Sequence, residues 1–173
     1  TNMWCLWNLG LLGEPLLGEF GLVAAYLLTG IAGNLLGIAV HPQLPDHGGV
    51  LSAGASGAVF GLAGVLLVVL RSPLLPIPQF ELKRLRRSVW YFALLNFVID
   101  AGLWVAHTRL QVDNMAHLGG FLSGLAFGAP LIPRIGAARA VFVRRRALTI
   151  GVMTFALLLI AWGLRSFYGA AAG

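Results

Sequence analysis

Two residues of this sequence, Ser56 and His117, have the side chains needed for nucleophilic catalysis. Ser56 lies in Gly54-Ala55-Ser56-Gly57, and His117 lies in Ala116-His117-Leu118-Gly119-Gly120. Each stands about one helical turn inside an apolar segment, next to a polar loop. A histidine within hydrogen-bond reach of a serine can accept the hydroxyl proton while the oxygen attacks a carbonyl carbon. Backbone N–H groups at a helix start beside Ser56 would suit the developing negative charge.

Glycines recur at four-residue intervals in the segments that carry these two side chains. They are Gly57 and Gly61 in the first segment, and Gly120, Gly124 and Gly128 in the second. At 100° per residue, the glycines of the second segment fall within about 80° of His117. Glycine faces let two membrane helices approach closely, so we expect the Ser56 helix to pack on the His117 helix. Each motif alone also fits simple packing, or chance in a chain with 23 glycines.

The composition places both residues in a membrane protein. Hydrophobic residues make up 58% of the 173 residues, and charged residues only 10%. A soluble domain carries about 25% charged residues. The composition therefore excludes a disordered chain, a basic DNA-binding domain and most soluble enzymes. The one cysteine, Cys5, allows no internal disulfide.

Six apolar segments are predicted to cross the membrane, where about 20 apolar residues cover the hydrocarbon core. They are residues 1–13, 20–40, 55–70, 88–106, 114–132 and 147–168. The expected fold is all-α, a polytopic membrane helix bundle of about six transmembrane segments.

The positive charges orient this bundle. Ten of the twelve Lys and Arg residues lie in the linkers 71–87 and 134–146. Two spans separate these linkers, so both lie on one side of the membrane, and the positive-inside rule makes that side cytoplasmic. The loops 41–54 and 107–113 then lie outside. The third and fifth spans both run inward, which allows them to be parallel neighbours.

With these motifs in this order, the sequence resembles the rhomboid family of intramembrane serine proteases. The resemblance runs from Thr1 to about Pro133. Three motifs carry it: Asn2 with Leu9-Gly10 and Glu14 resembles the end of the HxxxN helix, Gly54–Gly57 with Phe60 and Gly61 resembles GxSG, and Ala116–Gly120 after Asp113-Asn114 resembles AHxxG.

The resemblance implies that Ser56 is the nucleophile and His117 its general base, as a dyad without a third member. It implies that Asn2, Gly54 and Ala55 help to bind the oxyanion and substrate. Phe60 would lie close beneath the dyad. The implied partners are single-span transmembrane substrates and the lipid bilayer, without nucleic acid, and no cofactor or metal is implied.

The resemblance also predicts the organisation of the chain. Residues 1–133 would form a rhomboid core, 134–147 a basic cytoplasmic linker and 148–173 an additional C-terminal transmembrane helix. The family's first helix and first loop would precede Thr1, as would a histidine four residues before Asn2. The expected location is a bacterial cytoplasmic membrane, with the basic loops in the cytoplasm.

Other interpretations stay open at this point. A rhomboid relative that binds membrane clients without cleaving them is the main alternative, and a transporter or channel is another. Asp113 is expected to cap the fifth helix, although it stands four residues before His117 and would also be placed to orient it. Asn34 and Asn96 are expected to bond neighbouring helices.

Overall fold

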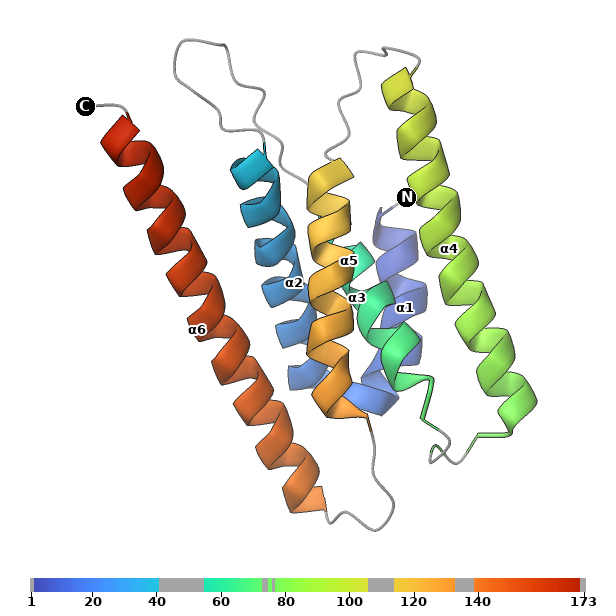
Figure 1. Ribbon diagram of the computed structural model, residues 1–173. Helices are drawn as coiled ribbons and strands as arrows, with labels where there is room; N and C mark the ends of the chain where they lie inside the picture. Colours follow the sequence, from blue (N-terminus) through green and yellow to red (C-terminus); the bar gives the residue numbers. More distant parts are fainter. Residues whose placement is uncertain are drawn as a thin grey trace.

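The fold is a bundle of α-helices, known from a computed structural model that describes residues 2–40, 55–72, 75, 77–105, 114–132 and 139–171. Over these residues it contains no strand. The helices are α1 (Asn2–Leu17), α2 (Glu19–Val40), α3 (Ser56–Val69), α4 (Gln79–Val105), α5 (Asn114–Gly128) and α6 (Arg139–Ala171), with a 3₁₀ turn η2 (Ala129–Leu131) after α5 (Figure 1). The predicted all-α fold is confirmed.

A single residue separates α1 from α2. Gly18 has φ +73°, in the left-handed region that glycine adopts without a steric penalty. Its N–H donates to Glu14 O at 2.8 Å, which closes the last turn of α1. Pro15 lies inside α1, although the residues between the first two predicted spans, 14–19, would by themselves suggest a turn. The reversal therefore needs only Gly18.

The basic runs are helical, which makes the linkers shorter than predicted. Residues 83–87 lie within the first turns of α4, and residues 144–146 lie within the first turns of α6. Lys and Arg have high helix propensity. Their long side chains can also reach the membrane surface from a helix that continues past it. Of the linker predicted at 134–147, residues 139–147 are helix.

The helices alternate in direction. In Figure 1, α1, α3 and α5 run one way, and α2, α4 and α6 run the other. The starts of α3 and α5 therefore lie at one end of the bundle. The starts of α4 and α6, with their basic residues, lie at the opposite end, as the charge pattern predicted.

Helix α3 forms the centre of the bundle. Twelve of its residues are buried, and it contacts α1, α2, α4 and α5. At about 1.5 Å per residue its 14 residues extend about 21 Å, short of the roughly 30 Å hydrocarbon core. Among the described helices, α2 and α6 are long and apolar enough to cross a membrane.

Glycines bring the backbones of α3 and α5 into direct contact. A Cβ atom on Gly120 would collide with Gly57 O, and one on Gly124 would collide with Gly61 O. A Cβ atom on Gly128 would lie 2.9 Å from Val65 O. Because the contact positions rise together along both helices, α3 and α5 are parallel. The predicted packing of the third and fifth spans through glycine faces is confirmed.

Helix α2 completes this core from the other side. Thr29 is fully buried, and its side chain fills the space that a Cβ atom on Gly61 would occupy. The Thr29 hydroxyl donates to Ala25 O at 2.6 Å, so the buried polar group is satisfied within α2. A Cβ atom on Gly33 would collide with Ala116 O on α5. Helix α2 therefore packs closely against both α3 and α5.

Helix α6 lies along α2 and is bonded near both ends. Arg146 Nη1 donates to Leu17 O at 2.8 Å, and the Tyr168 hydroxyl donates to Ala39 O at 3.2 Å. Between these bonds most of its large apolar side chains are exposed, as expected for a surface that faces lipid. They include Val152, Phe155, Leu158 and Trp162.

We expect Gly124→Ala to destabilise the bundle. The added methyl would force α5 away from Gly61 O, and overpacking of this kind costs about 1–3 kcal/mol. Gly151→Ala is the matched control, because a Cβ atom there has nothing within 4 Å. Thermal unfolding in detergent measures both. Equal melting temperatures for the two variants would contradict the contact.

Candidate active site

Ser56 and His117 lie at the same end of two touching helices. Ser56 is the first residue of α3 and is partly buried. His117 lies in the first turn of α5 with 5% of its surface exposed. Between them a Cβ atom on Gly57 would lie 3.1 Å from Ala116 O. The chain neighbours of the two residues are thus in contact.

The ring of Phe60 fixes the face on which this pair lies. It stacks on the His117 ring with centroids 4.5 Å apart and planes 24° apart. Residues four apart share one helix face, so Ser56 is on the same side of α3 as Phe60, one turn further out. The hydroxyl is therefore on the side of α3 that carries the imidazole. The expectation that Phe60 lies close beneath His117 is confirmed.

Helix α4 supplies the other side of this aromatic contact. Phe60 is 3% exposed, and its ring lies 4.7 Å from that of Phe97 and 6.1 Å from that of Phe92. Phe97 in turn makes an edge contact with Phe121 of α5, at 6.1 Å. Sequence reasoning missed these α4 residues, because aromatic side chains in an apolar span carry no motif. They extend the aromatic cluster that Phe60 begins against the imidazole.

The start of α3 offers backbone donors beside Ser56. Val59 N–H donates to Ala55 O at 3.1 Å, the first bond of the helical pattern. The N–H groups of the residues before Val59 precede that pattern, as at every helix start. Donors of this kind can bind a developing oxyanion. Ala55 is exposed in the turn before α3.

Asn2 is the first residue of α1, which starts at the same end of the bundle as α3 (Figure 1). The two helices run in the same direction, and a Cβ atom on Gly13 of α1 would lie 3.6 Å from Leu66 Cδ2 of α3. The Asn2 side chain is exposed. Its predicted oxyanion role stays a prediction.

Asn114, the first residue of α5, is a polar group to which the sequence analysis gave no role beyond its place in the motif. It stands one turn before His117, and its Oδ1 is buried without a hydrogen-bond partner in the part of the chain that the structure describes. Asparagine is among the preferred residues at helix starts, so the sequence could have indicated Asn114 as the start of this helix.

Several predicted features lie outside the described residues. These are Gly54, Asp113, the loop 41–54 and the loop 107–113.

The expectation that Asn96 bonds a neighbouring helix is wrong. Its Nδ2 donates to Phe92 O at 2.8 Å, four residues earlier in α4. A polar side chain in an apolar helix can satisfy itself on its own backbone, and Asn96 does so. Asn34 is exposed on α2.

The fold and the site define a helical membrane protein with a serine and a histidine on adjacent helices. A family model described as the rhomboid domain matches residues 1–134. The chain belongs to the rhomboid family. The family is embedded in membranes. No solved structure matches the chain.

Similar proteins include proteases and proteins named inactive. The chain is 29% identical over 166 residues to rhomboid protease GluP of Bacillus subtilis, covering 95% of this chain and 29% of that protein. It is 33% identical over 132 residues to Rhomboid-like protein 11, chloroplastic, of Arabidopsis thaliana, covering 72% and 44%. It is 31% identical over 149 residues to human inactive rhomboid protein 2, covering 86% and 16%. The chain thus spans less than half the length of each of these relatives.

These similarities leave the location and the activity of this chain as predictions. The relatives come from a bacterium, a plant and a human, so they support a membrane protein without selecting the bacterial cytoplasmic membrane. Their names include both an active protease and an inactive protein. Family membership alone therefore does not decide whether this chain cleaves its partners, and the geometry of the site is the further evidence.

Phe60→Ala should destabilise the protein, because Phe60 fills the space between α3, α4 and α5. Buried Phe-to-Ala changes cost about 3–5 kcal/mol in soluble proteins. In a bilayer the loss is mainly of packing, so we expect the lower end of this range. Phe155→Ala is the control, since Phe155 is 64% exposed on α6. If both variants unfold at the parent's midpoint in detergent, the stacked arrangement is incorrect.

Proposed function

We propose that this protein is an intramembrane serine protease in which Ser56 is the nucleophile and His117 the general base. The observation that supports this most directly is the stack of Phe60 on His117. The imidazole lies against Phe60, one turn from Ser56 along α3, which supports a serine and histidine that act together. The chain belongs to the rhomboid family, which includes a named protease, so peptide-bond hydrolysis is the reaction we propose for this pair.

The reaction would be acyl transfer followed by hydrolysis. The Ser56 hydroxyl attacks the scissile carbonyl carbon, and His117 accepts its proton. The imidazolium then gives that proton to the leaving amine as the peptide bond breaks. A water molecule, activated by His117, attacks the acyl ester and releases Ser56.

The negative charge of each tetrahedral intermediate needs donors. We assign this role to the backbone N–H groups at the start of α3 and to the Asn2 side chain, with Gly54 and Ala55 shaping the substrate-binding side. The start of α1 at the same end of the bundle as the start of α3 supports this assignment. Each such donor is worth about 10²–10³ in rate in a serine protease.

The substrates would be single-span transmembrane proteins. The start of α3 lies at the end of the bundle away from the basic residues (Figure 1), so cleavage would take place near the outer membrane surface. By the positive-inside rule the basic ends of α4 and α6 face the cytoplasm. We propose a bacterial cytoplasmic membrane as the location.

A second candidate function is client binding without cleavage. The resemblance to inactive rhomboid protein 2 favours it. A fluorophosphonate that reacts with activated serines separates the two candidates. Labelling of the parent chain that disappears in Ser56→Ala supports the protease, and an unlabelled, folded parent chain supports client binding.

Ser56→Ala and His117→Ala should each abolish cleavage of a reporter transmembrane helix in liposomes. Removing the hydroxyl opens little space, so we expect the stability of Ser56→Ala to change by less than about 1–2 kcal/mol. The double variant should be no slower than either single variant, because the two residues act as one unit.

Ser123→Ala is the control for this series. The Ser123 hydroxyl donates to Gly120 O within α5, at 2.9 Å, so its loss should leave cleavage intact. Cleavage retained in Ser56→Ala would exclude Ser56 as the nucleophile. Independent, multiplying losses would argue against a dyad.

Asp113→Asn distinguishes a dyad from a triad. Asparagine caps a helix as well as aspartate does, so the dyad predicts a rate within about tenfold of the parent. An orienting carboxylate would cost about 10⁴ in kcat, by analogy with soluble triads. Initial rates at saturating substrate decide between them, and a loss of that larger size in a folded variant would overturn the dyad.

A further inference from the structure

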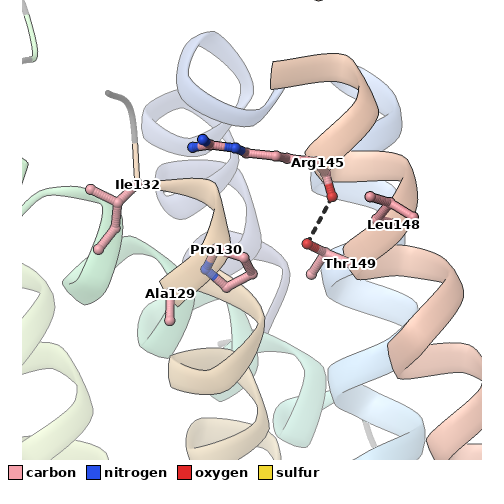
Figure 2. Close-up of a pocket in the computed structure, with 6 residues that line it drawn as sticks. All are labelled: Ala129, Pro130, Ile132, Arg145, Leu148 and Thr149. Carbon is pink, nitrogen blue, oxygen red and sulfur yellow. Dashed lines mark hydrogen bonds between the residues drawn. The ribbon is translucent and has the colours of Figure 1, made fainter. Parts of the chain in front are cut away.

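A cavity lies between the end of α5 and the start of α6, away from the candidate active site. Its volume is about 400 Å³, within the range of about 300–1,000 Å³ that is usual for small-ligand sites. Figure 2 shows the side chains that line it: Ala129, Pro130, Ile132, Arg145, Leu148 and Thr149.

The lining combines one cation with apolar side chains. Arg145 is half-buried, and its side chain extends from α6 toward η2 above Pro130 (Figure 2). Thr149 is a second polar residue of the lining, and its hydroxyl donates to Arg145 O at 2.9 Å. None of the six described lining residues is a carboxylate. The cavity therefore suits a ligand with an anionic part and an apolar part.

The three consecutive arginines at this position have different surroundings. Arg146 donates to Leu17 O across the bundle, and Arg144 is exposed on α6. Arg145 is the member of this triplet that lines the cavity. A variant of Arg144 therefore changes the net charge as a variant of Arg145 does, but leaves the cavity unaltered.

The depth of the cavity matches that of lipid headgroups. Arg145 stands near the start of the apolar stretch Ala140–Gly169, which is long enough to cross a membrane. This end of the bundle also carries the basic residues of α4 (Figure 1). Basic pockets between membrane helices on the cytoplasmic side are suited to anionic lipid headgroups.

We propose that this cavity binds the phosphate-bearing headgroup of an anionic phospholipid. The Arg145 guanidinium donates to the phosphate oxygens. Pro130, Ile132 and Leu148 contact the glycerol and the first methylenes of the acyl chains. A free phosphate shares the charge but lacks the apolar part that these side chains match.

The test is binding of phosphatidylglycerol to the purified chain in a neutral detergent, measured by native mass spectrometry with phosphatidylcholine as the reference lipid. We expect Arg145→Gln to weaken phosphatidylglycerol binding about fivefold, which corresponds to the ~1 kcal/mol of one basic residue near a membrane. Arg144→Gln should bind as the parent does. Ala129→Phe, which puts a ring into part of the cavity without a change in charge, should weaken binding at least as much as Arg145→Gln.

Three results would overturn the proposal. Equal weakening by Arg144→Gln and Arg145→Gln would mean a diffuse attraction to the basic surface. Unchanged binding in Ala129→Phe would place the lipid elsewhere. Complete competition by millimolar inorganic phosphate or glycerol phosphate would identify a soluble phosphate as the ligand. All variants are compared at melting temperatures within a few degrees of the parent, and none alters the residues proposed for catalysis.

Discussion

Gly57 and Gly61 on α3, with Gly120 and Gly124 on α5, let two backbones touch where side chains would keep them apart. In lipid there is little hydrophobic drive to press helices together, so packing at backbone distance has to supply the attraction. The same contact sets the relative depth of the two helix starts. Since Ser56 and His117 belong to those starts, their relative position depends on the packing of these glycines.

The helices around this contact have separate tasks. Helix α2 packs against both α3 and α5. Thr29 fills the space beside Gly61 of α3, and Gly33 leaves room for the carbonyl oxygen of Ala116 in α5. Helix α4 packs its aromatic rings against Phe60, which in turn stacks on the imidazole. Its remaining large apolar side chains are mostly exposed, Leu94, Leu95 and Val98 among them. One side of the candidate active site is thus formed by backbone contacts between α3 and α5, and another by the aromatic rings of α3 and α4.

Much of this arrangement could be predicted from the sequence, because four-residue glycine spacing and clustered positive charge act through simple geometry. The parallel pairing of α3 with α5 and the placement of the basic ends depended only on these two rules. The lengths of α4 and α6 could not be predicted from apolarity, since Lys and Arg continue a helix beyond the hydrocarbon. The Phe92 and Phe97 contacts depend on the rotation of α4, which no sequence spacing fixed. The hydrogen-bond partner of Asn96 could not be predicted either, because its amide can bond the backbone of its own helix as well as a neighbouring helix.

Among the described residues, two hydrogen bonds join α6 to other helices, and both are accepted by carbonyl groups in the last turn of the other helix. Leu17 ends α1, and Ala39 is the next-to-last residue of α2. Carbonyls at these positions have no acceptor role inside their own helix. Helix α6 is therefore bonded to carbonyl groups that the core helices do not use as acceptors. Breaking these two hydrogen bonds removes none of the hydrogen bonds within the core helices. The helices that carry Ser56 and His117 can therefore keep their own backbone hydrogen bonds whether or not α6 is attached.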